Sequence, residues 1–396
     1  MNFTFHWTCC GVSYAYFLVE MKSKVLFRVL RRHNFLTGKI RLVLFRIFRR
    51  HRLRGFIGLS ILAIIILLSI VKLKHKVGEN QSLLKFQEMN GPLVFKVSQR
   101  SQSWEVFTEG NIRQTGAIFP RNSKPPITTR SPYLIPNQKI CSGILALTYV
   151  IVVHSAPRNV DRRLSLRRTW ANQTLFKHTK SRTVFLLGRP ADHSLQKGIY
   201  EENNRFGDIV QGTFTDVYQN LTLKAVLGLR WITENCRQAK FVIKADDDVF
   251  INIPEAMVHV FPILAQNQRE IICLVEPHGP IGRLPGHRWA VSHEYFSGLS
   301  EYPMPFCYGF ATFYTVRMAM ELFERAKITP FYKMDDVYVY GILASQIKGV
   351  TWRNAREVFV RGDWEPASNV FIVFRTVLVS LLRSDEDMHQ LWNRFL

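Results

Sequence analysis

The chain has 396 residues, of which 47% are hydrophobic, and its formal net charge is +23. A chain of this length can bury a large core and suggests two or three domains. The strong positive charge raises the question of a nucleic-acid partner. Neither zinc-finger spacing nor an RNA-binding aromatic signature accompanies that charge, so we predict no nucleic-acid partner.

The positive charge is concentrated in the first 54 residues. They contain twelve Lys or Arg side chains and one acid, Glu20, and so supply +11 of the +23. An uncharged apolar run follows at 56–71, which Gly55 and a snorkelling Lys72 extend toward the roughly 20 residues of a membrane span. The more basic flank of a membrane helix faces the cytosol. We therefore predict a cytosolic tail over residues 1–54 and a transmembrane signal anchor over residues 55–73.

Residues after the anchor are then expected in the lumen of the secretory pathway. Three N-x-S/T sequons lie there, at Asn80, Asn172 and Asn220, although such tripeptides often arise by chance. The same part contains an even number of cysteines, as is typical of an oxidising compartment. Three pairings are possible, and ordinary buried thiols are the alternative. These cysteines are Cys141, Cys236, Cys273 and Cys307.

Residues 74–139 are mixed and polar and end in a Pro-, Ser- and Arg-rich stretch, which favours an extended lumenal stem. From residue 140 to 396, apolar runs alternate with amphipathic segments. The runs at 145–153, 184–187 and 241–243 are typical of buried strands, and Thr215 or Asp216 could cap an intervening helix. Strands that alternate with helices predict a layered α/β sheet with flanking helices, which we take as one domain.

Three adjacent carboxylates, Asp246, Asp247 and Asp248, follow the apolar run 241–243. Because they repel one another, a fold keeps them together only on a wetted surface or around a cation. Ligands of open α/β sheets bind at the carboxyl ends of strands, and hard oxygen ligands there suit Mg²⁺ or Mn²⁺ holding a diphosphate. A solvated acidic turn is the alternative interpretation of the triplet alone.

Six short motifs follow one another over residues 145–345. They are NVDRRLSLRRTW at 159–170, FLLG at 185–188, GDIV with FTDVYQNLTLK at 207–224, the triplet, YPMPFCYG at 302–309 and DDVYVYG at 335–341. In this order and spacing they resemble the lumenal β1,3-glycosyltransferases that transfer galactose or N-acetylglucosamine from UDP-sugars. The resemblance implies a GT-A-like nucleotide-sugar-binding sheet, a glycan acceptor on glycoprotein or glycolipid, and a single-pass type II protein of the Golgi membrane.

The resemblance also implies roles for individual carboxylates. Asp248 corresponds to the ligand of Mn²⁺, and Asp246 and Asp247 correspond to residues that orient the ribose and the sugar. Asp336 corresponds to the catalytic base, although a helix N-cap is the alternative role for its side chain. A single carboxylate base implies direct displacement with inversion. Cys307 is more similar to the galactose-transferring members, which favours UDP-galactose as the donor.

Arg162, Arg163 and Arg167 are candidates for binding the uridine-side phosphates or for closing a strand-to-helix turn. Their alternative is a solvated basic helix face. Two features depart from the family pattern. Bulky residues at 310–313 replace a glycine-rich stretch, and the histidine expected as a second metal ligand after the base is not accounted for. The only histidine after Asp336 is His389, whose setting resembles the segment beyond that ligand. These departures keep open a catalytically silent homologue that binds a glycan or nucleotide. A basic membrane-anchored protein that uses only its tail is the third hypothesis.

Overall fold

The computed structural model describes residues 104–113, 118–126, 132–176, 179–360, 379–382 and 385–395. The chain divides into two compact units, residues 1–93 and 94–396, and all the described residues belong to the second. Within these ranges no helix is long and apolar enough to cross a membrane. The predicted tail (1–54) and anchor (55–73) lie outside them and stay predictions.

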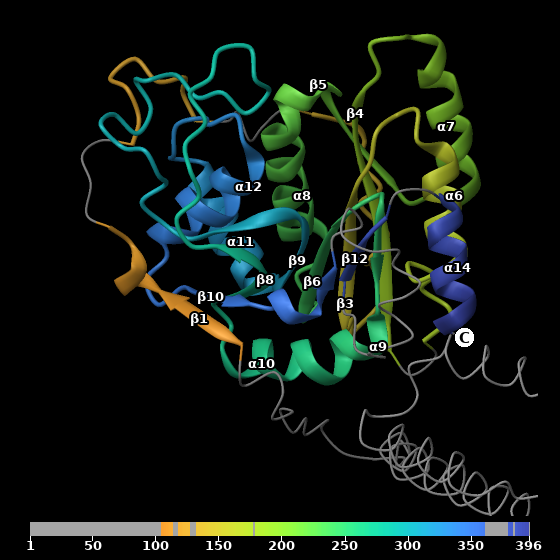
Figure 1. The fold of residues 1–396 in the computed structure, drawn as a ribbon. Helices are drawn as coiled ribbons and strands as arrows, with labels where there is room; N and C mark the ends of the chain where they lie inside the picture. Colours follow the sequence, from red (N-terminus) through yellow and green to blue (C-terminus); the bar gives the residue numbers. More distant parts are fainter. Residues whose placement is uncertain are drawn as a thin grey trace, which may run out of the picture. The chain divides into compact units, whose positions relative to one another are not determined.

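A mixed sheet of nine strands forms the centre of the described unit (Figure 1). In spatial order its strands are β1 (Glu105–Thr108), β10 (Thr351–Asn354), β8 (Glu270–Glu276), β9 (Phe306–Thr315), β6 (Phe241–Asp246), β3 (Tyr149–His154), β4 (Ser181–Arg189), β5 (Ile209–Thr215) and β2 (Tyr133–Ile135). β3 is parallel to both β4 and β6, and β4 is parallel to β5. β9 runs antiparallel between β6 and β8. A smaller sheet joins β11 (Phe359–Val360), β12 (Val379–Leu381) and β7 (Val249–Ile251).

The alternation of side chains along β3 explains why both faces of the large sheet are covered. Val150 and Val152 point into one hydrophobic core, while Tyr149, Ile151 and Val153 point into the other. All six residues of the strand are buried. A strand buried on both faces has a continuous apolar sequence, which is why this run was recognisable. The predicted α/β sheet with flanking helices is therefore confirmed, although the strand begins at residue 149 and Leu145 is exposed.

Helices cover the two faces of this sheet, as Figure 1 shows. One core receives side chains of α8 (Leu221–Asn235), α11 (Val316–Ala326) and η5 (Tyr338–Leu343). The other receives side chains of α6 (Val160–Arg168), α9 (Ile253–Glu255), η4 (Ala256–Val260), α10 (Phe261–Gln266), η7 (Arg356–Val358) and α14 (Asp385–Phe395). α7 (Ser194–Phe206) packs on β4 and β5 near the β2 edge. The remaining short elements are η2 (Glu109–Asn111), η3 (Tyr218–Asn220), α12 (Asp335–Val337) and η6 (Ala344–Gln346).

The helix predicted to begin at Thr215 or Asp216 begins later. Thr215 is the last residue of β5, and helix α8 starts at Leu221 after the 3₁₀ turn η3. The Asp216 carboxylate accepts a hydrogen bond from the Gly188 backbone N–H at 2.6 Å and contacts Lys224 Nζ at 2.9 Å. Asp216 therefore does form polar contacts, but they connect the end of β5 to β4 instead of capping the helix.

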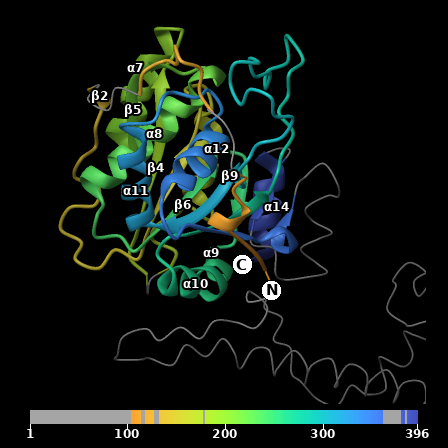
Figure 2. The same ribbon diagram turned by 90° about the vertical axis from the view of Figure 1, so that its left-hand side faces the viewer.

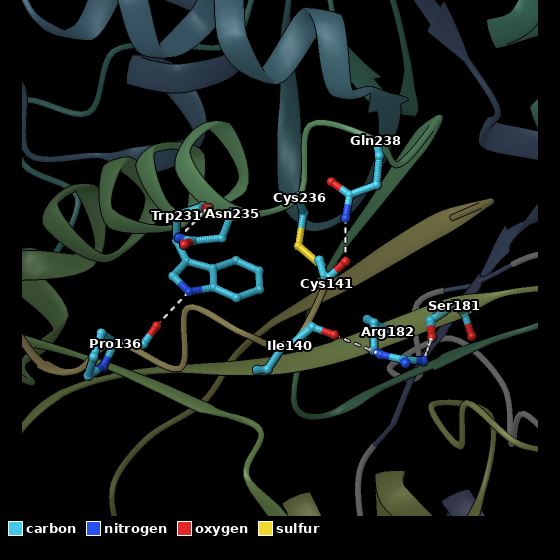
Figure 3. Close-up of a disulfide and its surroundings, with 9 residues drawn as sticks. All are labelled: Pro136, Ile140, Cys141, Ser181, Arg182, Trp231, Asn235, Cys236 and Gln238. Carbon is cyan, nitrogen blue, oxygen red and sulfur yellow. Dashed lines mark hydrogen bonds between the residues drawn. A yellow bond between two sulfur atoms is a disulfide. The ribbon is translucent and has the colours of Figure 1, made fainter. Parts of the chain in front are cut away.

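Two disulfides in the described unit settle the pairing that the sequence left open. Cys141 bonds Cys236, and Cys273 bonds Cys307 across β8 and β9. The first joins the segment before β3 to the end of α8, as Figure 3 shows. Nearby, the Trp231 indole N–H donates to the Pro136 carbonyl at 2.8 Å, so that segment is held at two points.

The folded unit begins before residue 140. Strands β1 and β2 come from the segment predicted as an extended stem, yet β1 pairs with β10 and β2 pairs with β5. Polar composition hid these strands because each lies at an edge of the sheet, where one side faces solvent. The remainder of the predicted stem, residues 74–103, lies outside the described residues.

Candidate active site

The candidate site lies at the carboxyl ends of the central parallel strands. His154, the last residue of β3, is the register partner of Asp246, the last residue of β6. The turn after β3 leads into α6, and the acidic triplet follows directly from β6. This edge of an open α/β sheet is where ligands bind, because neighbouring strands connect in opposite directions and leave a crevice there.

Asp247 joins these two strand ends. Its buried carboxylate accepts hydrogen bonds from Ser155 Oγ at 2.7 Å, Asn159 Nδ2 at 2.8 Å and Arg162 Nη1 at 3.0 Å. Only 7% of its side chain is exposed. Protein donors therefore occupy the oxygens of Asp247, which orients the β3–α6 turn. Asp247 was predicted to contact the sugar or the ribose, but its carboxylate is buried and already bound by these protein donors.

Asp246 and Asp248 present more open carboxylates on either side of Asp247. Their side chains are 38% and 36% exposed. Asp246 Oδ1 accepts a hydrogen bond from Lys244 Nζ at 2.6 Å, and Asp248 Oδ2 lies 3.3 Å from Arg162 Nη1. These two aspartates are the triplet members that remain available to a ligand.

Asp336 lies near the triplet, since the charge of Lys244 lowers the pKa of both Asp336 and Asp246 against the effect of burial. It lies in α12, beside Gly309 of β9, and its carboxylate accepts a hydrogen bond from the Val337 N–H at 2.8 Å. A Cβ placed on Gly309 would lie 3.2 Å from the Asp336 Cβ, which is tighter than ordinary packing. Glycine at 309 therefore allows α12 to approach the sheet closely.

The electrostatics link the two groups of acids into one site. Burial raises the pKa of Asp336 to about 7, and the neighbouring charge of Asp335 contributes to that rise. Burial also raises the pKa of Asp246 to about 6; Lys244 opposes this shift, whereas Asp248 and Asp335 reinforce it. Burial by itself would lower the pKa of Lys244, but Asp246 and Asp335 outweigh it and raise that pKa. A bound cation would reduce the electrostatic repulsion among these carboxylates.

A divalent cation fits this chemistry in part. Asp246 and Asp248 offer the hard oxygens that Mn²⁺ and Mg²⁺ prefer. Across the described ranges, however, no cluster of three or more His, Cys, Asp or Glu side chains could hold a metal ion. His389 does not supply the missing ligand, because its Nε2 contacts Ser165 Oγ of α6 at 3.2 Å. Phosphate oxygens of a bound nucleotide, together with water molecules, would complete the coordination.

The three candidate arginines do not share one environment. Arg162 contacts Asp247 and Asp248 at the site. Arg163 is completely buried, and its guanidinium donates to Glu202 at 2.6 Å and to Ser155 Oγ at 3.0 Å. The predicted phosphate contact of Arg163 is therefore wrong, because its donors already bind protein acceptors.

Arg167 is likewise committed to the protein. It contacts Asp208 at 2.7 Å and Glu202 at 2.8 Å, and its guanidinium stacks over the rings of Phe185 and Phe206. Its predicted phosphate contact stays a prediction. Together with Arg163 it fastens α6 to α7, which fits the alternative role of closing the strand-to-helix turn.

Several residues at the site escaped the sequence-based prediction of binding roles. Ser155, Asn159 and Lys244 all contact the triplet, and Asp335 shapes its electrostatics. Asn159 opens the first motif and Lys244 precedes the triplet, so motif position was their only signal. The bulky stretch 310–313 belongs to β9, where Ala311 and Phe313 point into one core. The bulky residues that stand in place of the family's glycines therefore fit within a regular strand.

Comparisons with known proteins agree with this geometry. Residues 161–354 match the family described as Galactosyltransferase. The chain is 30% identical over 288 residues to beta-1,3-galactosyltransferase 1 of Mus musculus and of Homo sapiens, an overlap of 72% of this chain and 82% of either relative. It is 34% identical over 198 residues to human beta-1,3-galactosyltransferase 5, covering 48% of this chain and 60% of the relative.

A solved glycosyltransferase involved in glycosylation of the major capsid of PBCV-1 overlaps 61% of this chain and 98% of its own, at 8% identity and a TM-score of 0.33. That overlap is too loose to carry an argument. The sequence relatives define the class, and the acidic edge of the sheet is consistent with it: this is a glycosyltransferase. The chain belongs to the galactosyltransferase family.

The different environments of Arg162 and Arg163 generate a first prediction. Arg163→Ala should lower the free energy of unfolding by about 3–5 kcal/mol, because it leaves the Glu202 carboxylate buried without its partner. Arg162→Ala removes the same side chain from a partly exposed position and should cost about 1 kcal/mol or less. Denaturant titration of both variants with the disulfides intact measures the difference. Equal losses of stability would contradict the assignment.

Proposed function

We propose that this protein is an inverting, metal-dependent β1,3-galactosyltransferase of GT-A type that uses UDP-galactose. The observation that carries the proposal is the pairing of two open carboxylates, Asp246 and Asp248, with a carboxylate of raised pKa, Asp336, at one sheet edge. The names of the relatives favour galactose over N-acetylglucosamine. The acceptor would be a glycan on glycoprotein or glycolipid.

On the donor side, Asp248 would hold the cation, with Asp246 beside it. Bound Mn²⁺ would neutralise the charge that develops on the leaving UDP. Arg162 lies next to Asp248 and would also stabilise negative charge on the phosphates. Asp247 holds Arg162 and the β3–α6 turn in position for this work.

On the acceptor side, Asp336 would take the proton from the attacking hydroxyl. Its pKa near 7 suits a general base, because about half of the group is ionised at neutral pH and the ionised form still binds a proton well. The hydroxyl oxygen would attack the sugar's anomeric carbon as the bond to UDP breaks. One displacement without a covalent enzyme intermediate converts an α-linked donor into a β-linked product.

A catalytically silent homologue remains the second candidate. It is favoured by the lack of a protein cluster of three metal ligands in the described ranges and by the contact of His389 with α6. Such a protein would bind UDP or a glycan without turnover. Sugar transfer to an acceptor, measured with and without added Mn²⁺, separates the two functions.

The two carboxylate sites should fail in different ways. Asp248→Ala removes a hard oxygen ligand, so Mn²⁺-dependent UDP binding should weaken and transfer should disappear with it. Asp336→Asn retains shape but removes the proton acceptor, so UDP binding should survive while the rate falls about 10²–10⁴-fold. Calorimetry of UDP with Mn²⁺, beside a transfer assay, measures both effects.

Wild-type chain assayed with UDP-galactose and UDP-N-acetylglucosamine in parallel provides the reference for these variants. Near-normal transfer by Asp336→Asn would show that the base is another residue. Consumption of UDP-N-acetylglucosamine alone would contradict the galactosyl donor.

The raised pKa of Asp336 also predicts a pH dependence. A general base acts only when ionised, so the rate should increase with pH, pass its midpoint at about 7 and level off above about 8. Between pH 6 and pH 8 the ionised fraction of such a group rises about tenfold, and kcat at saturating donor should follow it. Asp336→Asn should lose this inflection. A wild-type rate that falls across the same interval would contradict a base at this position.

We also propose that the protein is a single-pass type II protein of the Golgi membrane with its catalytic unit in the lumen. Two disulfides in that unit support an oxidising compartment. In intact microsomes the C-terminus should resist added protease, and Asn172 or Asn220 should carry glycan that a glycosidase removes. Cleavage at the C-terminus without detergent would contradict this topology.

A further inference from the structure

An exposed cluster of aromatic and cationic side chains lies outside the residues assigned so far. Trp289 and Tyr218 are each 45% exposed, and the indole N–H of Trp289 donates to the Tyr218 hydroxyl at 2.6 Å. The guanidinium of Arg288 lies 4.4 Å from the Trp289 ring centroid and 5.4 Å from that of Tyr218. We call Tyr218, Arg288 and Trp289 the aromatic platform.

The platform joins two segments that are far apart in the sequence. Tyr218 belongs to η3, which follows β5, and Trp289 belongs to the long connection between β8 and β9. Figure 2 shows this connection as an extended loop at the same end of the unit as α12. The hydrogen bond between the rings uses the indole N–H, so what the pair offers a ligand is mainly ring surface.

Contacts on one side connect the platform to the acidic triplet. Asp216, two residues before Tyr218, binds Lys224 Nζ at 2.9 Å. Lys224 Nζ also donates to the Ser155 carbonyl at 2.6 Å, and Ser155 Oγ binds Asp247. η3 is therefore tied to the turn that positions the donor-side acids.

Contacts on the other side connect it to the proposed base. The ammonium of Lys333 donates to the carbonyl of Ala290, the residue after Trp289. Lys333 lies three residues before Asp336 in the chain. Tyr302, near the end of the same loop, contacts the Tyr332 hydroxyl at 3.0 Å. The loop that carries Trp289 is thus fastened to the segment that delivers Asp336.

We infer that the aromatic platform is an acceptor subsite that stacks a pyranose ring of the glycan acceptor, an inference that rests on the proposed function. The C–H face of a sugar ring is apolar with slightly positive hydrogens, and it matches the negative face of an aromatic ring. The guanidinium of Arg288 adds hydrogen-bond donors for the sugar hydroxyls. η3 is tied to the turn beside the triplet, and the loop is tied to the segment that carries Asp336, which suits a substrate that must reach both.

The test compares Trp289→Ala with wild type in the full chain purified in detergent. UDP-galactose serves as donor, and the acceptor probes are methyl β-glycosides of galactose, N-acetylglucosamine and N-acetylgalactosamine together with N-acetyllactosamine. The acceptor KM should rise about tenfold or more, while kcat and the UDP dissociation constant stay within about twofold. Trp289→Phe retains a ring and should recover part of the loss.

Matched controls separate stacking from loss of any exposed apolar side chain. Tyr200→Ala removes a tyrosine that is 44% exposed on α7, and Leu284→Ala removes a residue that is 72% exposed in the same loop. Both should leave the acceptor KM unchanged. Retained UDP binding shows that Trp289→Ala is folded. A second variant, Arg288→Gln, keeps the ring of Trp289 and should also raise the acceptor KM.

An unchanged acceptor KM in Trp289→Ala and Arg288→Gln would overturn the inference while leaving the proposed transferase intact. An equal loss of UDP affinity would also overturn it, because the ring would then stack the nucleotide base. If wild type transfers no sugar, saturation-transfer NMR with the same four probes decides the matter. Binding that Trp289→Ala abolishes would uphold the subsite although the transferase had failed, and no binding by wild type would overturn both.

Discussion

The hydrogen bonds of Asp247 are the interaction on which the rest of this site depends. This buried carboxylate holds the end of β6 to the turn after β3 through Ser155, Asn159 and Arg162. A buried charge is tolerated only when donors surround it, and here three side chains do so. The Asp247 side chain is buried, whereas those of its two neighbours in the chain, Asp246 and Asp248, are partly exposed. The hydrogen bonds of Asp247 therefore fix how the side chains of Asp246 and Asp248 are presented.

A network of buried ion pairs next to this turn holds α6 in place. Arg163 shares Ser155 with Asp247 and reaches Glu202, while Arg167 shares Glu202 and reaches Asp208. Removing one member would leave a charge without a partner in a dry environment, which costs far more than losing an exposed pair. A motif rich in arginine thus does two kinds of work. Its first arginine, Arg162, contacts Asp247 and Asp248, and the other two support the turn on which it lies.

Under the proposed function, the acids and the platform form an order from donor to acceptor. Burial, reinforced by the charge of Asp335, raises the pKa of Asp246 and of Asp336, which favours a cation on one side and a proton acceptor on the other. Lys333, which precedes α12, donates to the Ala290 carbonyl and so ties the loop between β8 and β9 to the segment that carries Asp336. An acceptor that stacks on this loop would approach the sugar from the side of the base.

The sequence by itself determined the layered sheet, the family and the positions of the acids, because runs of buried strands and ordered motifs are local signals. Tertiary structure decided which groups face a ligand. Arg162 and Arg163 are adjacent in one motif, yet one faces the crevice and the other is buried, since successive helix residues point about 100° apart. It also chose the disulfide pairs and brought Tyr218 to Trp289. Contacts between segments so distant in the chain depend on packing, which no local pattern records.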